Sequence, residues 1–185
     1  MQMRKFVLSI AWVTLLVALS GSGTAVAEGG KPTENAVKSA MIFNMIKFVD
    51  WPAEALANDA GTITVCVLGK GGLAGALDAL QGEQLKGRKV VVRQIKQVAD
   101  TGNCQVLVIG DVERRIVTTV IEQTRQLPLL TISDLPNFAQ AGGVVGFVEQ
   151  SGKIRFVINL SASAQHKVRI HSLLLKMARI VQDSQ

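Results

Sequence analysis

The sequence predicts a single α/β domain in which helices flank a mixed, largely parallel sheet with an antiparallel hairpin near its C-terminal end. Short β-branched runs alternate with helix-like segments along most of the chain, which is typical of strand–helix–strand units. No internal repeat or linker divides the sequence. The chain has 185 residues, 48% of them hydrophobic and 18% charged, so it can bury one core of ordinary size, and a disordered or collagen-like chain is excluded.

The first 27 residues have the features of a cleavable secretory signal peptide. Arg4 and Lys5 precede an apolar run over residues 6–19, and small residues follow, ending in Ala25-Val26-Ala27. The run is shorter than the roughly 20 apolar residues that a permanent membrane anchor needs. We therefore expect a signal peptide over 1–27, a disordered lead-in over 28–34 and one folded domain over 35–182, located in a bacterial periplasm.

The first helix is expected over residues 35–49, where apolar side chains such as Val37, Met41 and Met45 recur at helical spacing. Pro52 ends it, because the residue before a proline avoids the helical region. A short β-branched strand follows over 63–68, then a glycine-rich turn and a helix over 73–80. The next expected elements are strands over 89–93 and 106–109, a helix over 112–125 and a strand over 129–132.

The end of the chain changes character. Strands over 144–149 and 153–159 are joined by the short turn Gln150-Ser151-Gly152, which predicts an antiparallel hairpin. A closing amphipathic helix is expected over 172–181, because Leu173, Leu174, Met177, Ala178 and Val181 share one side of it.

The two cysteines are expected to form a disulfide bond. Cys66 lies in one predicted strand and Cys104 directly before another, and a lone cysteine pair in an exported protein is most often a structural bridge. The bridge would join two neighbouring strands of one sheet. The alternatives are two free buried thiols or a chemical role, although the spacing excludes a C-x-x-C redox motif and no zinc pattern accompanies it.

The segment Gly69-Lys70-Gly71-Gly72-Leu73-Ala74 follows a strand and opens a helix, as the G-x-G-x-x-A turn of dinucleotide-binding proteins does. The next strand ends near Arg93, where the ribose-binding acid of such proteins would stand. We therefore favour a tight structural turn over a nucleotide site, with another anion as the remaining alternative.

Two other segments could form a binding site. His166 and His171 are the chain's only imidazoles, and Arg169 lies between them; if the stretch is extended, Lys167, Arg169 and His171 share one face and could hold a carboxylate or phosphate. A solvated turn is the alternative.

The end of the first helix carries the second of these segments, with aromatic and charged side chains at Phe43, Lys47, Phe48 and Trp51. Aromatic residues at helical spacing are more often core than binding site. No nucleophile motif accompanies either segment. Nucleic-acid binding is disfavoured too, because the formal charge of +6 is dispersed and aromatic residues make up only 4% of the chain.

The segment from Ala40 to Pro52 resembles the opening of the YfiR-like periplasmic proteins. The resemblance continues in order through most of residues 35–182, in the segments around Cys66, 104–109, 131–143, 146–160 and 170–179. It implies the Cys66–Cys104 disulfide of that family, whereas a second, C-terminal disulfide of the family has no counterpart here.

The resemblance implies a regulator rather than an enzyme, with no cofactor and no metal. Such a regulator represses an inner-membrane diguanylate cyclase by contacting its periplasmic domain, lowers cyclic-di-GMP and biofilm formation, and is released when an outer-membrane, peptidoglycan-associated lipoprotein sequesters it. The resemblance also implies a homodimer and a small-molecule site near Arg169 and His171. We expect the partner or ligand contacts at Phe43, Lys47, Phe48, Trp51, Arg169 and His171; a small-ligand-binding module of another signalling system is the alternative function.

Overall fold

The computed structural model describes residues 31–57 and 61–182. All elements below belong to the compact unit Lys31–Gln185. The expected signal peptide over 1–27 and the first lead-in residues lie outside the described residues. Glu34, which was expected in the lead-in, is the first residue of a helix that Thr33 caps with its hydroxyl oxygen.

A mixed sheet of eight strands runs through the domain in the order β10-β8-β7-β6-β5-β2-β4-β3. Parallel pairing joins β4 to β2, β2 to β5, β5 to β6, β6 to β7 and β8 to β10, whereas β7–β8 and β3–β4 are antiparallel. The strands are β2 (Thr62–Leu68), β3 (Gln84–Leu85), β4 (Arg88–Ile95), β5 (Val106–Ile109), β6 (Leu130–Ser133), β7 (Val145–Gln150), β8 (Lys153–Asn159) and β10 (Arg179–Val181).

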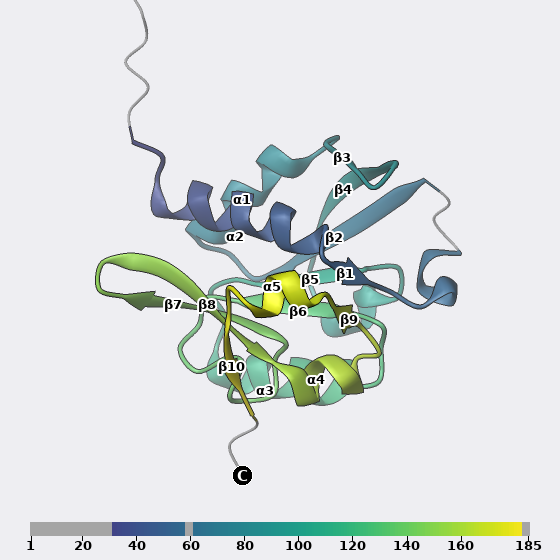
Figure 1. The fold of residues 1–185 in the computed structure, drawn as a ribbon. Helices are drawn as coiled ribbons and strands as arrows, with labels where there is room; N and C mark the ends of the chain where they lie inside the picture. The colour runs from purple at the N-terminus through teal and green to yellow at the C-terminus, as the bar shows by residue number, and fades with distance from the viewer. Residues whose placement is uncertain (1–30, 58–60, 183–185) are drawn as a thin grey trace, which may run out of the picture. The chain divides into compact units, whose positions relative to one another are not determined.

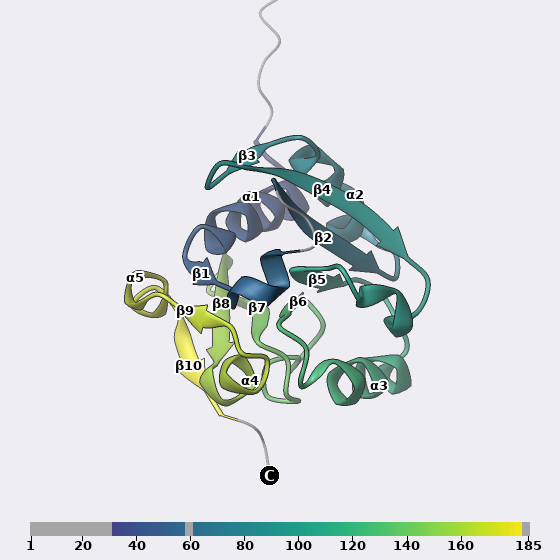
Figure 2. The same cartoon turned by 90° about the vertical axis from the view of Figure 1, so that its right-hand side faces the viewer.

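Helices cover both faces of this sheet, as Figures 1 and 2 show from two sides. The helices are α1 (Glu34–Ile46), α2 (Gly72–Ala76), α3 (Arg114–Thr124), α4 (Leu160–Gln165) and α5 (Ser172–Leu175), with 3-10 turns η1 (Ala53–Leu56), η2 (Leu77–Leu80) and η3 (Val98–Thr101). A separate two-stranded sheet pairs β1 (Val49–Asp50) with β9 (Arg169–Ile170).

The core has two parts, one on each face of the sheet. The larger part packs α1, α2 and α5 against inward side chains such as Val65, Val108 and Ile132. The smaller part packs α3 and the segment after β6 against Cys66, Leu107 and their neighbours. Strands β2, β5 and β6 are buried on both faces, which explains why they read as continuous apolar runs.

The predicted fold class is confirmed, and most predicted strands lie within two residues of their observed bounds. The hairpin turn is the two-residue pair Ser151-Gly152, with φ of +52° and +69°. Positive φ at both central residues matches the twist of the flanking strands, which is why this turn suits a hairpin.

The prediction of a final helix over 172–181 is wrong. Only Ser172–Leu175 is helical, and Arg179–Val181 form β10 beside β8. Of the expected apolar side chains Leu174 is buried, whereas Leu173 and Met177 are 58% and 61% exposed. The open edge of β8 supplies backbone partners to the β-branched end of the chain, and this tertiary pairing outweighs helical periodicity.

Two other differences have local causes. The first helix ends at Ile46 rather than 49, because Val49 and Asp50 pair with β9. Helix α4 was not predicted, since its Ser- and Ala-rich sequence has no apolar stripe; Asn159 caps it by accepting a hydrogen bond from the Ala162 N–H at 2.9 Å.

Candidate functional site

The pairing of β1 with β9 joins two segments that are far apart in the sequence. Val49 lies opposite Ile170 and Asp50 opposite Arg169, and the His171 N–H donates to the Phe48 carbonyl at 2.9 Å. Figure 2 shows the two strands side by side, with α5 following β9. We call this pairing the clasp: it brings the end of α1 and the Arg169–His171 segment into one surface.

A small polar cluster secures the clasp from outside. The His171 Nε2 lies 2.7 Å from one Asp50 carboxylate oxygen, and the Lys86 Nζ lies 3.2 Å from the other and donates to the Val49 carbonyl at 3.0 Å. The hydrogen bond from His171, followed by that from Lys86, holds the pKa of Asp50 below its ordinary value. The side chains of His171, Asp50 and Lys86 are 46%, 51% and 41% exposed, so water weakens these ion pairs.

Of the predicted contact residues, Phe48, Arg169 and His171 lie at the clasp, and Phe43 and Lys47 lie at the C-terminal end of α1 that leads into it. Arg169 and His171 are exposed on the same side of the β9 segment, because residues two apart in a strand share a face. Phe43 and Phe48 are half-buried, and the exposed Lys47 places its Nζ 4.5 Å above the Phe43 ring centre, a cation–π contact. The end of α1 therefore presents a cation and an aromatic face together.

Trp51 lies inside the domain instead. Trp51 is 8% exposed, and its indole N–H donates to the Gln105 carbonyl at 2.9 Å. Gln105 is itself buried, accepting from the Thr64 N–H and donating to the Ala55 carbonyl. Trp51 therefore anchors the chain that leaves β1, and Gln105, which the sequence analysis did not single out, is the residue that holds it.

An apolar hollow of about 210 Å³ adjoins Phe48. It lies between α1, β8 and the α5 region, and its walls are almost entirely apolar. Met177 lines the hollow and is 61% exposed. Leu173, which precedes the lining residue Leu174, is 58% exposed. The lining residues are Met41, Asn44, Met45, Phe48, Phe156, Leu174 and Met177.

His166 does not join this surface. It is 1% exposed, its Nδ1 lies 3.1 Å from the Leu127 carbonyl, and burial holds its pKa below the ordinary value. Lys167 has a φ of +55°, so the extended run of Lys167, Arg169 and His171 that would have formed a larger basic cluster is interrupted. His166 is a core residue, and His171 is the surface imidazole.

The glycine-rich turn after β2 packs against the turn after β5. The Asp111 N–H donates to the Lys70 carbonyl at 2.8 Å, and a Cβ atom on Gly110 would collide with that carbonyl. Gly69 has a φ of +93°, and its own Cβ would lie 2.9 Å from the Asp111 carbonyl oxygen. The glycines thus serve the close contact of two loops, in agreement with the structural turn favoured above.

The Cys66–Cys104 disulfide is confirmed in the structure, with Cα atoms 5.8 Å apart. It links β2 to the residue that leads into β5, and these strands are paired neighbours. Arg93, which stands where a dinucleotide-binding acid was sought, lies against the bridge: its Nη2 is 3.5 Å from the Cys66 Sγ and donates to the Asp100 carbonyl at 3.1 Å.

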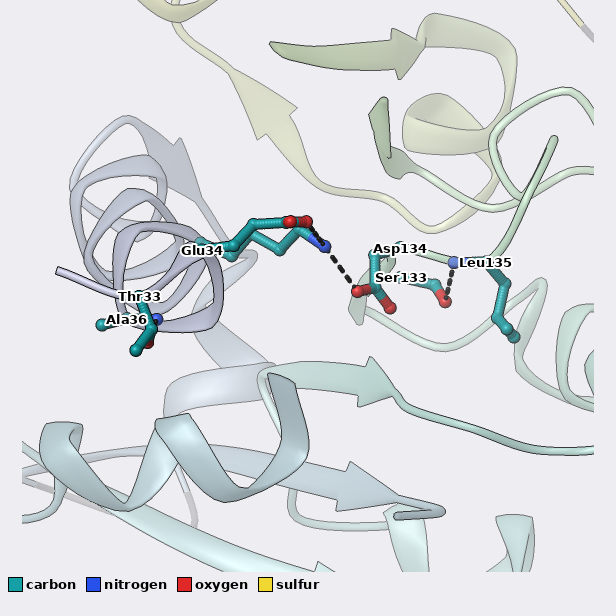
Figure 3. A network of polar contacts seen from close by, with 7 residues as sticks. Thr33, Glu34, Ala36, Ser133, Asp134 and Leu135 are labelled. Carbon is teal, nitrogen blue, oxygen red and sulfur yellow. Dashed lines mark hydrogen bonds and ion pairs between the residues drawn. The ribbon is translucent and has the colours of Figure 1, made fainter. Parts of the chain in front are cut away.

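A buried lysine connects α1 to the end of β6. The Lys38 Nζ lies 2.7 Å from carboxylate oxygens of both Glu34 and Asp134, and Figure 3 shows the two acids facing each other across the gap. Burial alone would lower the pKa of Lys38, but hydrogen bonds to Asp134 and Glu34 outweigh it and raise the pKa. This network fixes α1, and with it Phe43 and Lys47, on the sheet.

Within residues 31–57 and 61–182, no helix is long and apolar enough to cross a membrane. In the same described part of the chain, no group of three or more His, Cys, Asp or Glu side chains is placed to hold a metal ion.

A family model described as YfiR/HmsC-like matches residues 35–179, and that span holds both halves of the clasp. The chain belongs to the YfiR/HmsC-like family. Members of this family are regulators of cyclic-di-GMP signalling in the periplasm. The disulfide is consistent with that compartment.

Solved structures support the fold alone. A conserved domain protein from Vibrio cholerae has a TM-score of 0.51 at 13% identity, with 82% of this chain and 60% of that one covered. The ABC domain from Streptococcus pneumoniae, solved in complex with L-Trp, has a TM-score of 0.50 at 10% identity, with 75% and 59% covered. The chain thus spans about 60% of the length of these structures.

Proposed function

We propose that this protein represses an inner-membrane diguanylate cyclase from the periplasm, by binding the cyclase's periplasmic domain through the clasp surface. The proposed contact residues, called the clasp surface, are Phe48, Arg169 and His171 at the clasp and Phe43 and Lys47 at the C-terminal end of α1. If the protein binds the inactive conformation of the cyclase more tightly than the active one, it shifts the cyclase toward the inactive state. A ligand moves a conformational equilibrium only by its difference in affinity for the two states. Less cyclic-di-GMP and less biofilm would follow.

The observation that carries the proposal is the β1–β9 pairing. It places the end of α1 beside the Arg169–His171 segment, so that two sequence segments of the family's pattern meet at one exposed position. Asp50, which lies opposite Arg169, already has His171 and Lys86 as partners, so Arg169 is free to contact a partner protein in this proposal.

The chemistry of the clasp surface suits a protein interface. Aromatic residues and arginine are the usual anchors of such interfaces, and the hollow beside Phe48 would accept an apolar side chain of the partner. Trp51 would act indirectly, by holding β1 in place through Gln105.

Release of repression, dimer formation and export belong to the same proposal. An outer-membrane, peptidoglycan-associated lipoprotein would sequester the protein away from the cyclase, and the regulator would act as a homodimer. Residues 1–27 would direct export and be removed. These points rest on the family membership and on the signal-like sequence.

The test is a measurement of cellular cyclic-di-GMP in a strain lacking the gene and in strains complemented with exported variants. We expect deletion to raise cyclic-di-GMP, and the wild type and Arg115→Glu to lower it again. Arg169→Glu should fail to do so at equal periplasmic protein level and with an unchanged circular dichroism spectrum. Arg115 is the matched control, because it is an exposed arginine on α3 outside the clasp surface.

No rise on deletion would refute cyclase repression. Restoration by Arg169→Glu would leave repression standing but refute the assignment of the clasp surface.

A small-ligand-binding module remains the second candidate, favoured by the apolar hollow beside Phe48. A panel of amino acids and vitamins, L-Trp included, would be screened for a rise in melting temperature, which a ligand that binds only the folded state must cause. Loss of that rise in Phe48→Ala and Arg169→Ala would place the ligand at the clasp surface.

A further inference from the structure

A second, larger hollow lies on the other face of the sheet. Its volume is about 460 Å³, and it runs between α3 and the segment that follows β6. We call it the α3 groove. Its lining includes Arg114, Val117, Ile121, Glu122, Arg125 and Phe138. Its volume is in the range of small-molecule sites. Its floor belongs to the smaller part of the core, which contains none of the clasp residues.

The floor of the groove is built by close packing. Ile121 and Phe138 are 6% and 2% exposed. Gly142 adopts a φ of +109°, and a Cβ atom there would lie 2.9 Å from an Ile121 methyl carbon, while one on Gly143 would collide with the Phe138 ring. These two glycines let the segment after β6 turn tightly, which holds the apolar floor rigid.

The rim carries cations without protein partners. The guanidinium groups of Arg114 and Arg125 make no hydrogen bond or ion pair with the described residues, whereas the neighbouring Arg115 pairs with Glu113 at 3.6 Å. Both unpaired arginines border the groove, and Arg115 does not. An apolar floor beside unpaired guanidinium groups is complementary to an amphipathic anion.

The two ends of the groove differ in charge. Arg114 and Arg125 are eleven positions apart, roughly 16 Å along a helix. Glu122 lines the groove one turn before Arg125, whereas the lining residues near Arg114 include no acidic side chain. The Arg114 end also lies at the carboxyl edge of the parallel strands, where open α/β sheets bind their ligands.

We propose that the α3 groove binds a small amphipathic carboxylate, with its apolar body on Val117, Ile121 and Phe138 and its carboxylate on Arg114. The site is independent of cyclase repression and of the clasp surface. Arg114 matches one negative charge at its end of the groove, and Glu122 disfavours a second negative charge farther along, toward Arg125.

The test uses 4-phenylbutyrate as probe and 4-phenylbutanamide as its uncharged counterpart, titrated into the ¹⁵N-labelled folded protein. We expect the carboxylate to shift amide signals of α3 and of residues 135–141, and to bind at least tenfold more tightly than the amide. Arg114→Ala should weaken binding about 10- to 100-fold, the usual loss for a charged hydrogen bond. Arg115→Ala should change it less than twofold.

A second variant changes the shape of the groove without changing its charge. Ala141 is exposed at the rim, so Ala141→Phe would fill the groove without disturbing the core, and it should abolish binding. Equal affinity for carboxylate and amide, signal shifts confined to the clasp surface, or a dimer that Ala141→Phe dissociates would each overturn the inference. In the last case a second copy of the chain, not a small molecule, covers the groove.

Discussion

His171 and Asp50 are 121 positions apart in the chain, yet their Nε2 and Oδ2 atoms lie 2.7 Å apart. The contact depends on β1 and β9 pairing, because neither residue lies in the main sheet. It therefore reports directly on whether the clasp is closed.

The clasp contact should give a small stability term that disappears in acid. The pKa of Asp50 is lowered in the fold, so the ionised carboxylate is favoured there. Its contribution is present above the ordinary aspartate value near 3.8 and is lost as the pH falls through the lower folded value.

We expect Asp50→Asn to cost about 0–1 kcal/mol at pH 7, since the pair is half-exposed, and nothing near pH 2. Urea denaturation of both proteins at the two pH values measures this. A penalty that persists in acid would mean that the amide disturbs the clasp by another route.

The buried His166 should make the protein less stable in mild acid. Its pKa is lowered by burial, so below the ordinary value of 6.5 the unfolded chain takes up a proton that the folded chain refuses. Stability is then lost as the pH falls from about 6.5 toward the folded pKa.

Relative to His166→Gln, the wild type should lose about 1 kcal/mol between pH 7.5 and 5.5. Glutamine cannot titrate and can still donate to the Leu127 carbonyl. Equal losses in both proteins, measured by urea denaturation, would show that another group dominates in this pH range.

The disulfide should contribute substantially to stability. Cys66 and Cys104 are 38 positions apart, and the chain-entropy relation gives about 4 kcal/mol for a closed loop of this size. The double variant Cys66→Ala and Cys104→Ala should lower the free energy of unfolding by about this amount, measured from the urea midpoint. Alkylation of the exported wild type before reduction should find no thiol; two reactive thiols would contradict the bridge.

Trp51 and Gln105 should differ sharply in what their replacement costs. Trp51→Phe removes one indole hydrogen bond and keeps most of the packing, so about 1 kcal/mol is expected. Gln105→Leu leaves the Thr64 N–H and the Ala55 carbonyl without their partner inside the domain, at about 2–4 kcal/mol.

The same pair tests how Trp51 acts. If Trp51 only positions β1, then the Trp51→Phe variant should lower the cellular cyclic-di-GMP level as much as the wild type does at equal protein level. A loss of repression without a loss of stability would instead make the ring a direct contact.

Several of these elements are predictable from local pattern. The strands β2, β5 and β6 are predictable because a strand buried on both faces must be apolar throughout. The β7–β8 hairpin is predictable because Gly152 favours the positive φ that a two-residue turn needs. The disulfide pair follows from having two cysteines beside adjacent strands. Local pattern is silent on β1, β9 and β10, which are two or three residues long and exist through their partners.

The sequence by itself determined the α/β class, the order of the main strands, the family and the residue types offered for binding. Tertiary structure decided which of those residues meet. It buried Trp51 against Gln105, separated His166 from His171, and placed Arg169 opposite Asp50. The physical reason is that periodicity reports how one segment meets a core, whereas a site depends on pairing between segments whose contacts no local pattern encodes.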